Sequence, residues 1–392
     1  MLGGGSFLKK RAMMIATTAS MIEQFNKSNI SILQSLGYEV HVACNFRAGN
    51  NIPDDAVEAF KNYLLTNKVK IFDLPITRAP FAYGINLRNS LKVSKLIGKY
   101  QYEIIHCHTP MGSVVARLAV LLARKWHGRL IYTAHGFHFY NGAPKKNNLV
   151  YKSIERVLAH ATDSLVTINK EDYHSANKFT LRKNGQVYYI PGVGIDLTRY
   201  ADKLSVYDKK RNELGINDSD ILVLSVGELN LNKNHAVIIK ALSKCDFDNY
   251  VYIIAGQGNG KSRLEELAKK YGIEDKVKCI GYCSDIDDLF MAADIFVHPS
   301  FREGLSVAML QAMAAGLPIL ASRIRGNVDC LDEGEGGYLY APTDMEGFKD
   351  GLCELASSKR CREKMGAYNK KAARKYSIEN INKLMRQVYM GK

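Results

Sequence analysis

The sequence predicts an α/β protein with two doubly wound domains. Apolar segments of strand length alternate with segments of helical periodicity, which is typical of parallel sheets covered by helices on both faces. The alternation forms two runs of similar size, and 392 residues suffice for two domains that each bury a core. Segment 191–196, which contains one proline and two glycines, is the predicted linker. We therefore expect domains at residues 1–195 and 196–376.

Seven strands and four helices are expected in the first domain. Short apolar segments bounded by turn residues predict strands at 13–16, 39–44, 70–73, 103–106, 129–133, 164–168 and 187–190. Helical spacing of apolar residues predicts helices at 29–36, 87–100, 112–126 and 149–161. The glycine-rich residues 1–7 are expected to form a disordered leader outside the fold. Residues 17–21 follow the first strand and are either a phosphate-binding loop, which the absence of glycine disfavours, or a connecting loop with hydroxyl side chains.

The second domain repeats this pattern. Its predicted strands are 221–226, 250–255, 277–280 and 294–298. Its predicted helices are 235–243, 262–271, 285–291 and a segment that starts at 305 and ends before Gly316 and Pro318, followed by helical segments at 358–375 and 378–390.

The positive charge is concentrated in the first domain. Residues 1–195 contain 25 Lys and Arg against 11 Asp and Glu, whereas residues 196–392 contain 29 against 28. This asymmetry predicts an anionic partner for the first domain, either nucleic acid or an anionic membrane surface. No nucleic-acid-binding module is recognisable, so nucleic acid is not the expected partner.

Cysteine usage and hydropathy indicate the compartment. The eight cysteines are scattered without a C-x-x-C motif, and no secretory leader pattern opens the chain. No apolar run approaches the roughly 20 residues that span a bilayer. We expect a protein of the reducing cytoplasm.

A strand followed by a helix N-terminus predicts an anion-binding seat near the end of the chain. The apolar segment 294–298 is stopped by Pro-Ser, and helical sequence begins at Leu305. Gly304 and the amides of Leu305 and Ser306 are therefore expected where unpaired N–H groups and the helix dipole favour a phosphate. Gly304 has no side chain to keep a ligand from the backbone. Glu303 adds a carboxylate beside this seat.

Gln311 follows Glu303 by eight residues, which is about 12 Å along a helix axis and roughly on the same face. One nucleotide-sugar could then touch both residues. The segment Glu-Gly-Leu-Ser-x4-Gln-Ala-Met-Ala-x-Gly-x-Pro at 303–318 resembles the E-x7-E signature of retaining glycosyltransferases of the GT-B fold, similar to glycosyltransferase family 4. Segments 132–140 and 191–196 resemble the bacterial capsular and exopolysaccharide enzymes of this group.

The resemblance implies a fold, an activity and partners. It implies two Rossmann-like domains that face each other across a cleft, with the helix at 377–392 packed back on the first domain. It also implies a metal-independent, retaining transferase without a cofactor. The expected substrates are a nucleotide-sugar donor, namely a UDP-linked hexose or N-acetylhexosamine, and a glycan or lipid-linked acceptor used in capsule or exopolysaccharide synthesis. Such an enzyme would work at the inner face of the cell membrane.

Site roles follow from the same resemblance. Glu303 would hold the hydroxyls of the transferred sugar, and Gln311 would hold the ribose. The main chain at Gly304, Leu305 and Ser306 and the side chain of Lys233 would bind the diphosphate. Two departures from the family pattern affect these roles: Gln311 stands where the family has Glu, and Glu228 stands where relatives carry an arginine ahead of the lysine. A simpler interpretation also stays open, in which Glu303 complements a helix dipole and Gln311 is a solvated helix residue.

Two segments after strands complete the expected donor side. Gly256 belongs to a Gly-rich turn after the strand at 250–255, and this turn lacks the spacing of a dinucleotide fingerprint. Tyr282 lies in the loop that relatives place near the nucleotide base, although it could equally be a surface tyrosine. Asp285, Asp287 and Asp288 open a helix, and we interpret them as complementing its dipole rather than binding a metal.

Histidines mark the expected acceptor side of the first domain. His135 follows the strand at 129–133, where ligands of open α/β sheets collect, and it resembles the family's H-G histidine that contacts the transferred sugar. His108 ends another strand, and Ser20 follows the first strand. Together with His106 and His138, His108 and His135 could also form a metal site, but no carboxylate completes a ligand set, so we expect none.

A basic stripe predicts membrane docking. Four basic residues recur at i, i+4, i+7 and i+11 on the helix at 87–100, namely Arg88, Lys92, Lys95 and Lys99. An aromatic and apolar loop at 80–85 precedes them. This combination fits anionic lipid headgroups, although an ordinary solvated helix face remains the alternative.

A retaining glycosyltransferase is the predicted function. Two other classes remain open: a nucleotide-sugar epimerase or hydrolase of the same architecture, and, as a lesser alternative, a nucleic-acid-binding protein. The identity of the sugar, of the nucleotide and of the acceptor does not follow from the sequence.

Overall fold

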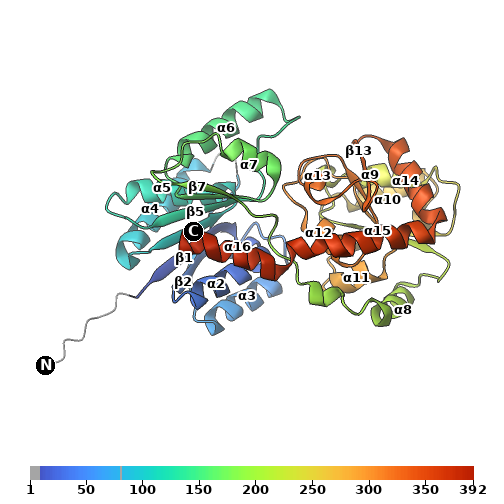
Figure 1. The fold of residues 1–392 in the computed structure, drawn as a ribbon, viewed down its shortest axis with the longest axis horizontal. Coiled ribbons are helices and arrows are strands. Elements are labelled where there is room, and N and C mark those ends of the chain that lie inside the picture. The colour runs from blue at the N-terminus through green and yellow to red at the C-terminus, as the bar shows by residue number, and fades with distance from the viewer. Residues whose placement is uncertain (1–8, 80–81) are drawn as a thin grey trace. The chain divides into compact units, whose positions relative to one another are not determined.

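The computed structural model describes residues 9–79 and 82–392 (Figure 1). The chain forms two compact units: residues up to Val193 together with Ile381–Lys392, and Gly194–Asn380. The leader predicted at residues 1–7 lies outside the described residues. Pro80 and Phe81 of the apolar loop lie outside them as well.

The first unit contains a seven-stranded sheet in the order β3-β2-β1-β4-β5-β6-β7, with every neighbouring pair parallel. Its strands are β1 (Arg11–Thr18), β2 (Glu39–Asn45), β3 (Lys70–Asp73), β4 (Ile104–His108), β5 (Arg129–Ala134), β6 (Ser164–Thr167) and β7 (Gln186–Tyr189). Its helices are α1 (Ala19–Phe25), α2 (Lys27–Ser35), α3 (Asp54–Thr66), α4 (Tyr83–Tyr100), α5 (Pro110–Leu122), α6 (Lys145–Ala159) and α7 (Lys170–Ala176).

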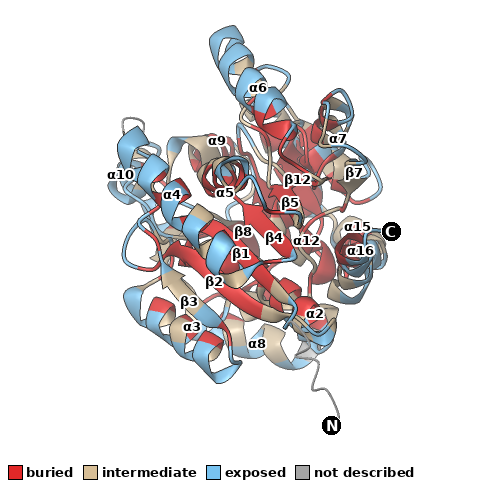
Figure 2. Ribbon diagram, turned by 90° about the vertical axis from the view of Figure 1, so that its left-hand side faces the viewer, coloured by how far each residue is buried: buried red, intermediate tan, exposed pale blue. Residues whose placement is uncertain are grey.

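Successive residues of β1, an interior strand, contribute to two separate apolar layers. Met14 and Ala16 of β1 pack with α1, α2 and α3, whereas Met13 and Ile15 pack with α4, α5 and the end of α6. Side chains of a strand alternate between the faces of its sheet, so the run of consecutive apolar residues in β1 supplies both layers. Figure 2 shows the resulting buried sheet between its helices.

The last helix, α16 (Ile378–Met390), belongs to the first unit from Ile381 onward. Ile381, Met385, Val388 and Tyr389 recur at helical spacing and join the core beneath α2. The Tyr389 hydroxyl lies 2.7 Å from Nδ1 of His106, and Arg129 donates to the carbonyls of Val388 and Tyr389. These polar contacts fix the end of α16 on the sheet.

The second unit contains a six-stranded parallel sheet in the order β10-β9-β8-β11-β12-β13. Its strands are β8 (Ile221–Val226), β9 (Tyr250–Ala255), β10 (Val277–Gly281), β11 (Ile295–His298), β12 (Ile319–Ser322) and β13 (Gly337–Tyr340). Its helices are α8 (Lys203–Leu214), α9 (His235–Leu242), α10 (Lys261–Lys270), α11 (Ile286–Ala292), α12 (Val307–Ala314), α13 (Asn327–Cys330), α14 (Met345–Ser357) and α15 (Lys359–Ala372).

The predicted α/β class with two doubly wound units is confirmed, and several local expectations are corrected. Residues 17–21 do not form a loop, because β1 continues to Thr18 and α1 begins at Ala19. The helix expected at 112–126 ends at Leu122, and the Trp126 indole N–H donates to the Tyr102 carbonyl in the connection to β5. No helix in the described part of the chain has the length and hydropathy required to cross a bilayer.

Candidate active site

The predicted site residues follow the carboxyl ends of neighbouring strands within each unit. In the second unit, Lys233 follows β8 and Glu303 follows the adjacent β11. In the first unit, His108 ends β4 and His135 follows the adjacent β5. Because carboxyl ends of parallel strands meet at one edge of a sheet, residues far apart in sequence become neighbours there.

Lys233 and Glu303 form an ion pair, with Nζ of the lysine 2.7 Å from Oε1 of the glutamate. Nε2 of His298 lies 3.4 Å from the same carboxylate oxygen. Burial alone would raise the pKa of Glu303, but the Lys233 ammonium and the nearby His298 side chain outweigh burial and hold that pKa well below its usual range. The carboxylate is therefore ionised throughout the physiological pH range.

Two asparagines hold the Lys233 loop against the Glu303 loop. The Asn232 side chain donates to the Arg302 carbonyl at 3.0 Å, and the Asn232 carbonyl accepts from the amide of Phe301 at 2.8 Å. Asn234, at φ 55°, donates to the carbonyls of Pro299 and Pro342 at 3.0 and 2.7 Å. These bonds satisfy loop backbone groups and fix the distance between Lys233 and Glu303.

The segment between Glu303 and α12 provides an uncapped helix N-terminus. Ser306 occupies the N-cap position but accepts no side-chain cap hydrogen bond, so the first amides of α12 depend on another acceptor. The helix begins at Val307, two residues later than the Leu305 start that the sequence predicts. The seat expected at Gly304 to Ser306 thus immediately precedes the first helical turn.

Arg325 is a buried cation at this seat that sequence reasoning missed. Its Nε donates to the Glu303 carbonyl at 3.1 Å. The next residue, Gly326, has φ +82°, and a Cβ there would lie 2.2 Å from the Gly304 oxygen, so only glycine lets the two loops approach this closely. The apolar segment at 319–322, directly after Pro318, could have predicted this residue's position. It forms strand β12, and Arg325 follows the carboxyl end of that strand.

The position of Gln311 corrects the expected geometry. Because α12 starts at Val307, Glu303 does not lie on its axis, and the expected 12 Å separation along one helix face does not apply. Nε2 of Gln311 instead lies 3.3 Å from Oδ1 of Asp287 on α11. Asp287 also accepts from the Tyr200 hydroxyl and, at 3.0 Å, from Arg199. Asp287 therefore does more than complement a helix dipole.

The remaining donor-side candidates lie in three loops. Tyr282, after β10, is about half exposed. Gly256, after β9, would place a Cβ 1.9 Å from the Gly227 oxygen, so its visible role is the close approach of two loops. Glu228 is exposed and accepts a hydrogen bond from the Asn230 side chain at 2.8 Å.

In the first unit the structure brings His108 and His135 together. Nδ1 of His108 lies 3.1 Å from Nε2 of His135. His108 is buried, and its Nε2 finds no hydrogen-bond partner among the described residues. His106 is engaged elsewhere, with Thr133 at 2.8 Å and with Tyr389. A buried imidazole nitrogen without a partner at a strand end suits a polar ligand.

Ser20 lies in the first turn of α1, where it is buried. Its amide donates to the Asn50 side chain at 2.9 Å, and its hydroxyl donates to Thr18 at 3.2 Å. The neighbouring Thr109 has φ 63° and accepts from the amide of Thr17 at 3.0 Å. These contacts tie the end of β1 to the end of β4.

A metal site at the histidines is not supported by the arrangement of donors. His138 lies against Tyr151, with ring centroids 5.3 Å apart. Within residues 9–79 and 82–392, no group of three or more His, Cys, Asp or Glu side chains is arranged to hold a metal ion.

The buried histidines predict acid-sensitive stability. Burial lowers the pKa of His135 to about 4 and that of His106 to about 3, and it holds the pKa of His108 well below its usual range. Between pH ~4 and ~6.5 the unfolded chain, with histidine pKa values near 6.5, binds more protons than the folded chain. The free energy of unfolding therefore has its full value above pH ~6.5 and falls as the pH drops toward ~4. We expect calorimetric Tm to fall by at least several degrees between pH 7.5 and 5.

The control for this effect is His127→Gln, because His127 is exposed. It should leave the pH slope of Tm unchanged, whereas His135→Gln should flatten it. Equal slopes in the wild type and His135→Gln would show that His135 does not contribute.

The basic stripe on α4 is exposed as predicted, with Arg88, Lys92, Lys95 and Lys99 all accessible to solvent. The opposite face of α4 buries Val93 and Ile97, among others, against the sheet.

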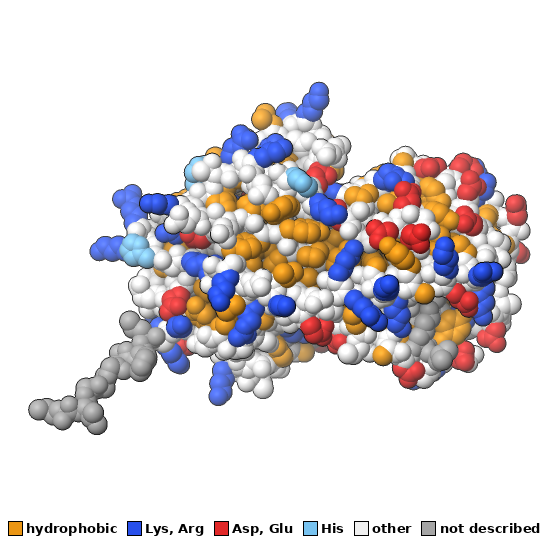
Figure 3. Space-filling model, viewed as in Figure 1, with side chains coloured by type: hydrophobic (Ala, Val, Ile, Leu, Met, Phe, Trp, Pro, Cys, Tyr) orange, Lys and Arg blue, Asp and Glu red, His pale blue; other side chains and the backbone are white. Residues whose placement is uncertain are grey.

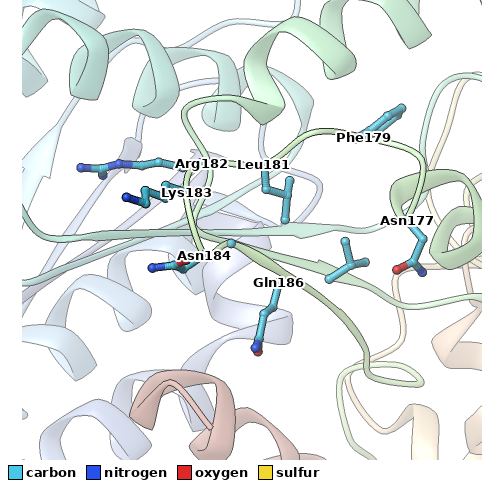
Figure 4. A pocket seen from close by; sticks show the side chains of 9 residues that line it. Asn177, Phe179, Leu181, Arg182, Lys183, Asn184 and Gln186 are labelled. Atoms are coloured by element: carbon cyan, nitrogen blue, oxygen red, sulfur yellow. The ribbon is translucent and has the colours of Figure 1, made fainter.

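A cavity of about 540 Å³ lies in the first unit, at the amino end of strand β7. It is lined by residues that include Phe179, Leu181, Arg182 and Gln186, around the loop that enters β7 (Figure 4). This loop precedes the amino end of β7, whereas His108 and His135 lie at carboxyl ends. The cavity is therefore separate from the candidate active site.

Two family models match the chain. Glycosyltransferase Family 4 matches residues 30–199, and Glycosyl transferases group 1 matches residues 206–372. EpsD of Bacillus subtilis (strain 168), described as a glycosyltransferase, is 34% identical over 385 residues, which cover 97% of each chain. The UDP-Gal:alpha-D-GlcNAc-diphosphoundecaprenol alpha-1,3-galactosyltransferase of Escherichia coli is 28% identical over 314 residues, which cover 77% of this chain and 80% of that protein.

Solved structures share the fold. Anabaena Alr3699/HepE in complex with UDP superposes with a TM-score of 0.78 at 19% identity, over 97% of this chain and 100% of that chain. WaaG, a glycosyltransferase involved in lipopolysaccharide biosynthesis, superposes with a TM-score of 0.74 at 17% identity, over 97% and 100%. Together with the family matches, the paired Rossmann-like units show that the chain is a glycosyltransferase of the GT-B fold and belongs to glycosyltransferase family 4.

Proposed function

We propose that this enzyme is a retaining glycosyltransferase that transfers a hexose or N-acetylhexosamine from a UDP-sugar to a lipid-linked or oligosaccharide acceptor in capsule or exopolysaccharide synthesis. The observation that carries the proposal is the partly buried ion pair of Lys233 and Glu303 next to the uncapped N-terminus of α12. The UDP-galactose enzyme of Escherichia coli, with its diphosphoundecaprenol-linked acceptor, supports the choice of substrate classes.

In the donor half-site, the diphosphate replaces Glu303 as the partner of Lys233. Lys233 is a point charge that suits a phosphate oxygen, and the free amides before α12 add hydrogen bonds and the positive end of the helix dipole. Released from Lys233, the Glu303 carboxylate accepts hydrogen bonds from sugar hydroxyls. Gln311 accepts from the ribose through its amide oxygen, since its Nε2 is directed at Asp287.

In the acceptor half-site, His108 and His135 orient the reacting groups. Their low pKa values leave both imidazoles neutral near pH 7, so they donate and accept hydrogen bonds without carrying charge. The leaving diphosphate oxygen takes the proton of the acceptor hydroxyl on the face where the new glycosidic bond forms. The configuration at the anomeric carbon is thereby retained.

The proposal assigns the charge of the leaving diphosphate to Lys233, Arg325 and main-chain amides rather than to a metal ion. Activity should therefore persist after dialysis against EDTA, and a requirement for added Mg²⁺ or Mn²⁺ would contradict this assignment.

The decisive experiment supplies radiolabelled UDP-glucose, UDP-galactose and their N-acetylamino counterparts with a short-chain lipid diphosphate-sugar acceptor. Transfer of label to the acceptor, with the anomeric configuration of the donor retained by NMR, would support the proposal. UDP release without acceptor would identify a hydrolase. Interconversion of UDP-glucose and UDP-galactose, or of their N-acetylamino counterparts, would identify an epimerase. Thermal shift with each donor identifies the preferred sugar, because bound ligand raises Tm.

The contact between Gln311 and Asp287 predicts how two substitutions affect donor binding. Gln311→Glu restores the residue that the family carries, yet it would place a second carboxylate about 3.3 Å from that of Asp287, and two such charges repel. We expect Gln311→Glu to raise the KM for the donor by about tenfold, with little change in kcat, and Asp287→Asn in the same chain to recover most of this loss. A lower KM in Gln311→Glu alone would contradict the contact.

Docking at the cytoplasmic face of the membrane is the final part of the proposal. Lys92→Glu/Lys95→Glu should lower co-sedimentation with phosphatidylglycerol vesicles by at least about tenfold, because each basic residue near an anionic surface contributes about 1 kcal/mol. Lys269→Glu/Lys270→Glu on α10 makes the same charge change at exposed positions of the second unit and should sediment like the wild type. Unchanged sedimentation of the α4 variant would reject docking through this helix.

A further inference from the structure

Helix α6 presents an apolar face to solvent. Five large apolar residues of this helix are exposed: Leu149, Val150, Tyr151, Ile154 and Val157. Leu149 is 71% exposed and Val157 is 69% exposed. Only Glu155, Leu158 and Ala159 of its fifteen residues are buried, all near the carboxyl end. Figure 2 shows α6 extending from the unit with most of its length exposed.

The inner face of α6 is held by a charged group rather than by an apolar stripe. Glu155 accepts from the buried Arg117 at 2.7 Å and from the Tyr132 hydroxyl at 3.3 Å. Helices of globular proteins normally gain stability by burying their apolar face. In α6 this arrangement is reversed, because the helix is anchored through an ion pair and directs its apolar residues outward.

Basic residues flank the outward apolar face on one side. Lys145, Lys152 and Arg156 are spaced at i, i+7 and i+11, which places them within a narrow arc of the helix. Leu149 and Val157 lie on the adjacent arc toward solvent. Figure 3 shows apolar and basic side chains next to each other over α6 at the top of the view. An apolar stripe with a basic border matches the boundary between headgroups and acyl chains of an anionic membrane.

We propose that α6 inserts its apolar face into an anionic lipid bilayer and acts as a second docking element, in addition to the α4 stripe. The surrounding charge suits an anionic surface, because residues 1–195 carry 25 basic against 11 acidic side chains, and the exposed apolar face of α6 suits the acyl chains of a bilayer. The helices α4, α5 and α6 contribute to one apolar layer on the same face of the sheet, so both docking elements belong to one side of the first unit.

This inference deepens the membrane docking proposed above, but it depends on a different physical effect. Attraction through α4 is electrostatic and is screened by salt, since the Debye length falls to about 3 Å at 1 M. Insertion of the α6 apolar face removes apolar surface from water and persists at high salt. The two contributions can therefore be measured separately.

The test is co-sedimentation with phosphatidylglycerol and phosphatidylcholine vesicles at 0.1 and 1 M NaCl. Leu149→Gln/Val157→Gln keeps charge and helix propensity, and it should lower the salt-resistant binding to phosphatidylglycerol vesicles by at least about tenfold. The control is Leu65→Gln on α3, because Leu65 is 61% exposed but isolated on the other face of the sheet. This control should bind like the wild type.

Three results would overturn the inference. The α6 variant could sediment like the wild type, the wild type could lack salt-resistant binding, or light scattering could show a wild-type dimer that the α6 variant dissociates. The last result would assign the face to self-association. Circular dichroism and activity with a water-soluble acceptor serve as controls for folding. A wild-type protein that lacks this activity would contradict the proposed transferase function and not the docking through α6.

Discussion

Replacing Lys233 by alanine is expected to lower kcat/KM by about 10² to 10³-fold, the range found when one preorganised electrostatic contact to a developing charge is removed. Lys233 forms the ion pair with Glu303 in the free enzyme and is the proposed partner of the leaving diphosphate. The measurement is steady-state kinetics together with calorimetric titration of UDP, whose affinity should fall as well. Wild-type kinetics would show that the diphosphate is bound elsewhere.

The Lys233 experiment needs two controls. Removing the ammonium leaves the partly buried Glu303 carboxylate without its ion-pair partner, which lowers the stability of the fold. Thermal unfolding must therefore confirm that Lys233→Ala is folded at the assay temperature. Lys240→Ala removes the same charge from an exposed position on α9 and should retain wild-type kinetics.

Glu303→Gln is expected to lower kcat by about 10² to 10³-fold without a loss of UDP affinity. Glutamine keeps the size of the side chain but loses the charge that accepts hydrogen bonds from the transferred sugar. UDP carries no sugar and meets Lys233 without competition from a carboxylate in this variant. The two variants thus separate sugar binding from diphosphate binding, and parallel losses of UDP affinity in both would contradict the assignment.

Much of the fold follows from local patterns. The interior strands of both sheets are buried on both faces, so they appear in the sequence as short continuous apolar segments, as at 221–226 and 250–255. Helix α16 was predicted with the bounds that the structure has, because its apolar residues recur at helical spacing. Short or polar helices such as α1, α7 and α8 were missed because their apolar periodicity is weak.

The candidate site was predicted only in part. Lys233, Glu303, His108 and His135 were identified because each follows a strand, and the structure places the members of each pair in contact. Arg325 was missed because β12 was not recognised. The expected relation between Glu303 and Gln311 was wrong because it assumed that the helix extends through the loop that carries Glu303.

The sequence by itself determined the alternation of strands and helices, the excess of positive charge in the first half and the residue types available at each strand end. These depend on composition and on spacing over a few residues. Tertiary structure alone decided which charges meet: Lys233 with Glu303 across 70 residues, Gln311 with Asp287, and Glu155 of α6 with the buried Arg117. Such pairs depend on strand order and on the exact start of each helix, and local spacing contains neither.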